Sequence, residues 1–489
     1  MSDHALDTEV LIVGAGPAGL MLAYELALAG VRATVLERAL EPLWCRGYNL
    51  NARSLDLLER RGLAEGFIAE GHQVPNVPAT GIVQPLSLAG TWTDHPFSLG
   101  IAQTRVEEVL AERAIALGAN VLRGREVRGI EQDAESVTAT VLSGGDLTHL
   151  TARYLVGCDG GRSVVRKSAG IAFPGTDATF FVLLGDVECD LPYGLSAGSN
   201  GRDVFVIPRP GYVRVIVRET DPPADKDTPV TLELLQSQVS EALGRQTELR
   251  APRWLTRFGD AARLAARFRA GRVLLAGDSA HIFPPAGAIG VNVAIDDAFN
   301  LGWKLAATVR GTAPEGLLDT YHDERHATGQ ALLANQSAQV LLNDRESPLA
   351  DLVQRVAAHP AGNRALTEIL TGLATCYLPG EHPWLGRLAP NLPLTTTDSE
   401  TTLASLLHPG RPVLLDLTPE RAFSTWSDSV TVISADCPAH PDIRALLLRP
   451  DGHTAWLSTT PTHDTGLPDA LHRWVTPAPA LTGSPAGIR

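Results

Sequence analysis

Residues 9–37 read EVLIVGAGPAGLMLAYELALAGVRATVLE, and this stretch decides the fold. A short β-branched run comes first, and Gly14, Gly16 and Gly19 follow it in the spacing G-x-G-x-x-G. An apolar stretch of helical character then leads to a second apolar run, which ends at Glu37. This order predicts a strand, a tight turn, a helix and a second strand, as in the βαβ unit of a dinucleotide-binding fold.

Each part of this unit has a task in holding a dinucleotide. The first glycine permits the turn, the second lets a pyrophosphate approach the backbone, and the third lets the helix pack closely on the strand. Free N–H groups and the positive dipole end at the helix N-terminus attract the phosphates. Glu37 can accept hydrogen bonds from ribose hydroxyls. The motif alone does not distinguish FAD from NAD, and the chain has no second G-x-G-x-x-G.

Two later stretches end in a similar way. Residues 153–163, RYLVGCDGGRS, are an apolar strand that leads to Asp159, and residues 271–281, GRVLLAGDSAH, are another that leads to Asp278. The ends of neighbouring parallel strands lie on one edge of a sheet, where ligands bind. We therefore expect both acids to lie near the turn at Gly14. Taken alone, Asp159 fits equally well an acid in a β-turn.

The composition narrows the class of protein. The chain has 489 residues, a length typical of about two to four domains. The net charge of -14 argues against nucleic acid and anionic membrane surfaces as partners, since both are gripped by basic side chains. No apolar run reaches the roughly 18 residues of a membrane-spanning helix. We therefore expect a soluble protein with neither nucleic acid nor membrane as a partner.

The termini and cysteines predict a compartment. The first residues, MSDHALDTE, are acidic and polar, unlike a secretory signal. The five cysteines are scattered and form no C-x-x-C pair, which argues against a disulfide framework and against a zinc site. We expect a cytoplasmic protein without a bound metal.

Three motifs together indicate a family. GAGPAG with Glu37, CDGGRS at 158–163 and GDSAHIFPPAGAIGVN at 277–292 resemble the class A FAD-dependent monooxygenases of the para-hydroxybenzoate hydroxylase type. Length and tail are most similar to the subgroup of aromatic polyketide hydroxylases and rifampicin monooxygenase-like enzymes. The resemblance implies an α/β FAD-binding Rossmann-like domain of the glutathione reductase-2 type at 1–175 and 266–385, an inserted antiparallel β-sheet substrate domain at 176–265, and a thioredoxin-like C-terminal domain at 390–489.

The resemblance implies that the bound cofactor is FAD. The glycine-rich turn would hold its pyrophosphate, Glu37 its adenosine ribose, and Arg46 its phosphates, while Val127 would contact adenine through the backbone. Arg46 and Arg105 also fit ordinary surface positions, because long polar side chains are mostly exposed. The candidate cofactor-binding residues are Gly14, Gly16, Pro17, Ala18, Gly19, Glu37, Arg38, Arg46, Gln103, Arg105, Val127, Asp159, Gly277, Asp278, Pro285, Gly287, Gly290, Val291 and Asn292.

The stretch after Asn292 has apolar residues at helical spacing, which predicts a helix. Asp296 and Asp297 are expected in its first turn, where acids suit the helix dipole. Free N–H groups at its start would stabilise the negative charge of a reduced flavin. Ile289 departs from the family, because many relatives carry a polar residue there.

The implied reaction is oxygen insertion. NADPH or NADH would reduce FAD, O2 would add to give a C4a-hydroperoxyflavin, and a polycyclic aromatic, polyketide-type substrate would be hydroxylated in secondary metabolism such as antibiotic biosynthesis. The cofactor supplies this chemistry, so neither a catalytic side chain nor a metal is expected. Two alternatives stay open: a Baeyer–Villiger or oxidative ring-cleaving monooxygenase on a similar substrate, and a flavin-binding protein without catalytic activity.

The middle and the tail have their own patterns. Residues 179–219 are rich in β-strand signals and would form a sheet over a substrate pocket, although each candidate also fits the core of that sheet. After about residue 385, a linker precedes three apolar runs that predict strands. We expect the tail to have a structural or homodimer-forming role. The substrate-contact candidates are Phe181, Leu183, Phe205, Ile207 and Arg214.

Overall fold

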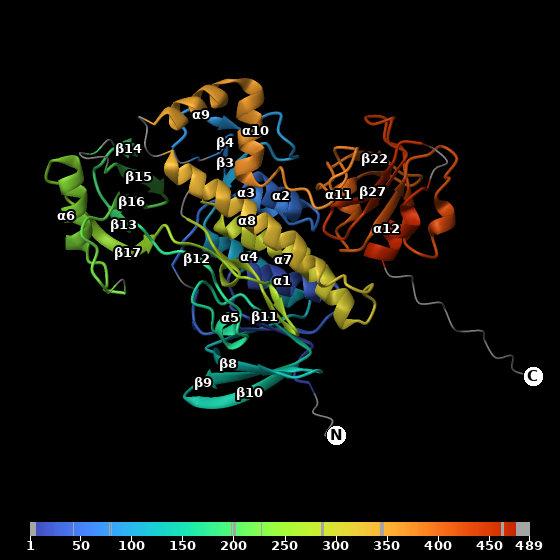
Figure 1. Ribbon diagram of the computed structural model, residues 1–489, viewed down its shortest axis with the longest axis horizontal. Helices are drawn as coiled ribbons and strands as arrows, with labels where there is room; N and C mark the ends of the chain where they lie inside the picture. The colour runs from blue at the N-terminus through green and yellow to red at the C-terminus, as the bar shows by residue number, and fades with distance from the viewer. Residues whose placement is uncertain are drawn as a thin grey trace, which may run out of the picture. The chain divides into compact units, whose positions relative to one another are not determined.

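The computed structural model describes residues 6–42, 44–77, 79, 81–196, 198, 202–225, 227–284, 288–342, 347–460 and 464–475. The chain forms two compact units, and the elements of each can be followed in Figure 1. The first unit comprises Met1–Pro174, Leu264–Ile282 and Ala286–Arg489, and the second comprises Gly175–Arg263 with Phe283–Pro285. The C-terminal region therefore belongs to the same unit as the glycine-rich segment.

A six-stranded sheet in the order β19-β20-β11-β1-β2-β7 forms the centre of the first unit. From β20 to β7 the strands run parallel, whereas β19 is antiparallel to β20. All residues of β1 are buried, as expected for a strand covered on both faces. The strands are β1 (Val10–Val13), β2 (Ala33–Glu37), β7 (Asn120–Arg123), β11 (Tyr154–Gly157), β19 (Arg269–Ala270) and β20 (Val273–Leu275).

Helix α1 connects β1 to β2, which confirms the predicted βαβ unit. It packs closely on α7: a Cβ at Gly302 of α7 would lie 2.4 Å from the Cβ of Glu25. No helix in the described part of the chain is long and apolar enough to cross a membrane. The helices of the first unit that precede its C-terminal region are α1 (Pro17–Leu28), α2 (Ala52–Glu59), α3 (Ala64–Glu70), α4 (Gln103–Ala116), α5 (Val164–Ser168), α7 (Gly290–Val309), α8 (Thr320–Leu341), α9 (Pro348–Ala358) and α10 (Pro360–Thr371).

Smaller sheets complete this part of the first unit. An antiparallel sheet is formed by β8 (Glu126–Gln132), β9 (Val137–Ser143) and β10 (Asp146–Ala152). The remaining short strands are β3 (His72–Val74), β4 (Asn76–Val77), β5 (Leu86–Ser87), β6 (Ser98–Gly100) and β21 (His281–Ile282).

The second unit is an antiparallel sheet in the order β14-β15-β16-β13-β17. Helix α6 (Leu232–Leu243) covers one face and shares an apolar cluster with it. The β-rich reading of the middle of the chain is thus confirmed. The strands of this sheet are β13 (Phe181–Glu188), β14 (Gly194–Ser196), β15 (Val204–Arg209), β16 (Tyr212–Arg218) and β17 (Arg250–Gly259). β12 (Gly175–Thr176) pairs with β18 (Ala262–Leu264) in a separate small sheet.

The C-terminal region forms a mixed sheet in the order β25-β24-β26-β27. β24 is parallel to β25 and antiparallel to β26, and β26 is antiparallel to β27. The third predicted strand of the tail is in fact a hairpin, because Pro450-Asp451-Gly452 turns the chain, with Gly452 at φ 84°. The elements are β22 (Pro393–Thr395), β23 (Glu400–Thr402), α11 (Leu403–Leu406), β24 (Val413–Asp416), β25 (Thr431–Ser434), β26 (Ala445–Leu448), β27 (Thr454–Ser458) and α12 (Leu467–Trp474).

Candidate functional site

The three predicted strand ends lie side by side. β1 pairs with β11 as far as Val13 and Gly157, and β11 pairs with β20 as far as Gly157 and Leu275. Beyond these pairs, Cys158 N donates to Val13 O at 2.7 Å, and Ala276 N donates to Gly157 O at 3.0 Å. The turns that follow the strands therefore leave the sheet at one edge, where α/β sheets bind ligands.

The three glycines of the first turn differ in what surrounds them. Gly14 has φ 106°, and a Cβ there would lie 2.3 Å from the carbonyl oxygen of Cys158. A Cβ at Gly19 would lie 2.0 Å from the carbonyl oxygen of Gly14. A Cβ at Gly16 would meet no atom within 4 Å. Gly14 and Gly19 are therefore needed for the turn itself, whereas Gly16 leaves space for a ligand beside the backbone.

Helix α1 begins at this space. Its N-terminal proline, Pro17, has no N–H group, and Leu20 N makes the bond to Gly16 O at 3.0 Å. The N–H groups of Ala18 and Gly19 come before that bond and so have no intrahelical acceptor. A helix start with free N–H groups beside an open backbone fits a pyrophosphate.

Glu37 lies at the end of β2, where a ribose-binding acid is expected. Its carboxylate accepts from the backbone N–H of Ala15 at 2.8 Å, so it also fixes the glycine-rich turn. Arg38 is exposed beside it. Arg125 N donates to Glu37 O at 2.9 Å, which brings the start of β8 and the buried Val127 to this edge of the sheet.

Gln103 binds Gly47, the residue after Arg46, and Gly47 approaches the start of α7. Gln103 accepts from Gly47 N at 3.1 Å, and a Cβ at Gly47 would lie 3.1 Å from Cγ2 of Val291. Gln103 also donates to Glu107 at 2.8 Å. Burial raises the pKa of Glu107, while the Gln103 hydrogen bond and the charge of Arg46 oppose that shift. Arg46 is exposed, and its contact with FAD remains a prediction.

Arg105 has ion-pair partners of its own. Its guanidinium donates to both carboxylate oxygens of Glu70 on α3, at 2.7 and 2.9 Å, and to Glu108 at 3.2 Å. These hydrogen bonds raise its pKa. The structure therefore favours the surface ion pair for Arg105 over the predicted contact with FAD.

Gly277 ties the third strand end to two helices. Its φ is 64°, and a Cβ there would lie 3.1 Å from the Cβ of Ala18 at the start of α1. Its N–H donates to Oδ2 of Asp297 on α7 at 2.9 Å. Only a residue without a side chain fits this crossing of α1 and α7.

Asp278 follows with a side chain that reaches solvent. The protein around it disfavours the charged form and raises its pKa, whereas His281 and Arg46 act in the opposite direction. The charge of Arg46 therefore acts on Asp278, and a ligand shared by the two residues remains a prediction.

Asp159 has structural partners of its own. Its carboxylate accepts from Ser163 Oγ at 2.5 Å and from the N–H groups of Val164 and Val165 at 2.7 and 3.1 Å. It therefore holds the N-terminus of α5, and a role towards FAD remains a prediction.

The loop before α7 is only partly described. The predicted residues Pro285 and Gly287 lie outside the described residues. Ala288 has φ 51°, a left-handed conformation that is uncommon for a residue with a Cβ and is often found at functional sites. The atypical Ile289 is buried at 5% exposure and precedes the helix.

Helix α7 begins at Gly290, three residues earlier than predicted. Val293 N donates to Ile289 O at 3.0 Å. The N–H groups of α7 that precede Val293 come before this hydrogen bond and have no acceptor within the helix. A Cβ at Gly290 would meet nothing within 4 Å. The side chain of Asn292 accepts from Asn51 N and Ser54 Oγ, both at 2.8 Å, and so fastens α2 to α7. Asn292 can reach a ligand here only through its backbone.

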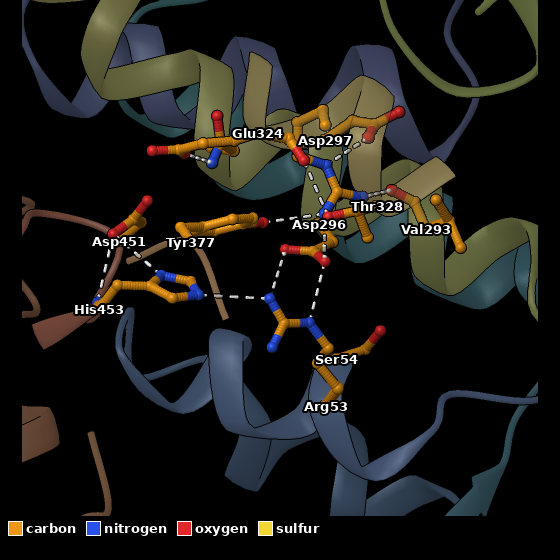
Figure 2. A network of polar contacts seen from close by, with 12 residues as sticks. Arg53, Ser54, Val293, Asp296, Asp297, Glu324, Thr328, Tyr377, Asp451 and His453 are labelled. Atoms are coloured by element: carbon orange, nitrogen blue, oxygen red, sulfur yellow. Dashed lines mark hydrogen bonds and ion pairs between the residues drawn. The ribbon is translucent and has the colours of Figure 1, made fainter. Parts of the chain in front are cut away.

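Asp296 and Asp297 are not in the first turn of α7; they anchor the buried network in Figure 2. Asp297 accepts from Arg325 and His281 at 2.7 Å each. Burial alone would raise its pKa, but His281 and Arg325 lower it to about 2. Asp296 binds Arg325 at 2.7 Å and Arg53 at 2.9 Å. In the sequence, two adjacent acids within an apolar helical stretch are the feature that could have indicated this network.

The five substrate candidates point to different faces of the second unit's sheet. Leu183 is fully buried in the cluster shared with α6, so it is a core residue and not part of a pocket wall. Phe181 has the same parity along β13. Phe205 pairs with Ile216 and Ile207 pairs with Arg214, so these residues share one face. Leu183 pairs with Val217, the neighbour of Ile216, so Leu183 lies on the opposite face.

Arg214 is buried and donates to Asp186 of β13 at 2.8 and 2.9 Å. Its guanidinium carbon lies 5.5 Å from the ring centre of Trp254. The structure thus shows an ion pair and an aromatic ring on that face, and a contact with substrate remains a prediction.

Comparisons with known proteins agree with this fold. The FAD binding domain family matches residues 7–336, and the aromatic-ring hydroxylase C-terminal family matches residues 382–478. The chain is 41% identical to the 12-dehydrotetracycline 5-monooxygenase/anhydrotetracycline 6-monooxygenase of Streptomyces rimosus, over 97% of this chain and 99% of that protein. It is 42% identical to the rifampicin monooxygenase of Streptomyces venezuelae, over 92% and 95%. The solved anhydrotetracycline hydroxylase of Streptomyces rimosus superposes with a TM-score of 0.90 at 39% identity, covering 96% of this chain and 100% of that chain.

Proposed function

The chain belongs to the FAD-dependent aromatic-ring hydroxylases, and from this premise we propose that it uses NADPH or NADH and O2 to hydroxylate a polycyclic, polyketide-type aromatic compound. The observation that carries the proposal is the open backbone at Gly16, set at the start of α1 between two glycines that the turn requires. We propose secondary metabolism as its setting, because the similar proteins named above act on tetracycline-type and rifampicin substrates.

The residues at the sheet edge fit FAD. The start of α1 would bind the pyrophosphate, Glu37 the adenosine ribose, and Arg46 with Asp278 the phosphates and the ribityl chain. When bound, FAD supplies the redox chemistry of oxygen activation, and the protein supplies binding, orientation and electrostatics. The free N–H groups at the start of α7 would stabilise negative charge on the ring system. The buried Ile289 would keep water away from that charge.

We further propose the three-part domain organisation expected from the sequence. The division at Pro174/Gly175 and Arg263/Leu264 supports a substrate domain at about the predicted place. The sheet order of the tail, with β26 antiparallel to both neighbours and β24 parallel to β25, supports a thioredoxin-like domain. Phe205 and Ile207 remain the proposed substrate contacts on the face of the sheet opposite α6.

The test is oxidation of NADPH by the purified, FAD-loaded protein across a panel of polycyclic phenols. We expect at least one compound to accelerate NADPH oxidation and to gain one oxygen atom. A product with an oxygen inserted into its carbon skeleton would favour the Baeyer–Villiger or ring-cleaving alternative. Tight FAD binding with no acceleration by any compound would favour a flavin-binding protein without catalytic activity.

A further inference from the structure

The turn of the β26–β27 hairpin, residues 449–453, reaches from the C-terminal region to α7 and α8. Arg449 binds both oxygens of Glu324 on α8, at 2.6 and 2.9 Å. Asp451 accepts from Nε1 of Trp303 on α7 at 3.2 Å. These residues are almost fully buried and belong to one compact unit. The hairpin is therefore an internal part of that unit.

His453 continues the contact towards α2. Arg53 Nη2 lies 3.3 Å from His453 Nε2. A guanidinium can only donate, so Nε2 must accept, which places the imidazole proton on Nδ1. Nδ1 lies 3.1 Å from Oδ1 of Asp451. The ring is thus a neutral imidazole in one fixed tautomer between an anion and a cation (Figure 2).

From Arg53, a series of hydrogen bonds continues to Gly277. Arg53 binds Asp296 with two hydrogen bonds, at 2.9 and 3.2 Å. Arg325 bridges Asp296 and Asp297 at 2.7 Å each, and Asp297 accepts the N–H of Gly277 at 2.9 Å. An unbroken series of hydrogen bonds therefore connects the hairpin to Gly277.

The arginines and the lysine of this network are paired with carboxylates. Each of these buried cations has a carboxylate partner within 3.2 Å. Removing one member of such a set leaves an uncompensated group in a low-dielectric interior, so the neighbours must rearrange. The cations are Arg53, Lys304, Arg325 and Arg449, and the carboxylates are Asp296, Asp297, Glu324 and Asp451.

We propose that the C-terminal hairpin is a support of the cofactor site, and that His453 is a positioning residue that acts through Arg53, Asp296, Arg325 and Asp297 on the backbone at Gly277. The proposal rests on the FAD site proposed above. It gives the C-terminal region a task in cofactor binding, in addition to a structural or dimer-forming one.

The acceptor role of His453 can be separated from its packing role. His453→Leu removes both polar atoms. His453→Gln can place a carbonyl oxygen near the position of Nε2, whereas His453→Asn reaches only about as far as Nδ1. His472→Leu is the matched control, because His472 is exposed on α12 of the same region.

Two measurements test the proposal: the Kd for FAD, and hydrogen exchange of the peptide that contains Gly277 in the apoprotein. We expect His453→Leu and His453→Asn to raise the Kd about fivefold and to speed exchange, with His453→Gln and His472→Leu within about twofold of the wild type. Equal losses in the Gln and Asn variants, or unchanged exchange in all of them, would overturn it.

The exchange measurement keeps this test separate from the proposed function. A wild-type protein that binds no FAD would sink the FAD assignment, while faster exchange at Gly277 in His453→Leu alone would still support the connection. If His453→Leu does not fold, the comparison of the Gln and Asn variants decides.

Discussion

Gly16→Ala should separate cofactor binding from folding. The new Cβ would meet no protein atom within 4 Å, and Gly16 has φ -82°, which alanine adopts without strain. The stability of the apoprotein should therefore change by no more than about 0.5 kcal/mol. The same Cβ would occupy the space in which a pyrophosphate approaches the backbone.

The expected loss appears only with FAD. Displacing the phosphates from the start of α1 removes a hydrogen bond to a charged group, worth about 1.5 to 3 kcal/mol. This corresponds to a rise in the FAD Kd of roughly 10- to 100-fold. The Kd is measured by titrating apoprotein with FAD and following flavin fluorescence. The thermal midpoint is measured without FAD.

Gly19→Ala is the matched control with the opposite signature. Its Cβ would lie 2.0 Å from the carbonyl oxygen of Gly14, so the helix must move away from the strand. Overpacking of this kind costs about 1–3 kcal/mol, and the midpoint of the apoprotein should fall. An unchanged FAD Kd in Gly16→Ala, or an undiminished midpoint in Gly19→Ala, would refute this reading of the turn.

Three further outcomes follow from the site. Asp278→Ala should lower the FAD content of the purified protein, read from its flavin absorbance. Full FAD content together with full activity would show that the loop at Asp278 does not contribute to the FAD site. Arg105→Ala should leave the FAD Kd within about twofold of the wild type, because Glu70 already holds the guanidinium. Asp297 and Glu324 have pKa values of about 2 in the fold and near 4 when unfolded, so between about pH 4 and 2 the unfolded chain binds more protons. Their stabilisation is therefore complete above about pH 4 and lost as the pH falls towards 2, and thermal midpoints across this range should show a shallower decline in Asp297→Asn.

Local patterns were enough to predict the first unit's nucleotide fold. The glycine spacing and the acid at Glu37 act over fewer than 30 residues. The strand that ends at 157 pairs in parallel with β1, and the strand that ends at 275 pairs in parallel with β11. The existence of α7 was likewise predictable, because apolar spacing defines a helix without knowledge of its neighbours, although its start at Gly290 lies before the predicted one.

The partners of charged side chains could not be read in this way. Arg53 and His453 are separated by 400 positions, so nothing in the sequence near either one indicates the other. Arg105 was a cofactor candidate because the family resemblance implies it, whereas its bond to Glu70 depends on how α3 lies beside α4. Leu183 and Phe205 both look like sheet residues, and only the register and α6 show which face is buried.

The most direct test of the oxygen-inserting function is an isotope measurement with the FAD-loaded protein, NADPH and a responsive polycyclic phenol under ¹⁸O₂. The account predicts a product that carries one ¹⁸O atom, formed with one NADPH consumed per product. Oxygen in the product that comes only from water, or NADPH oxidation that yields only hydrogen peroxide with every compound, would contradict it.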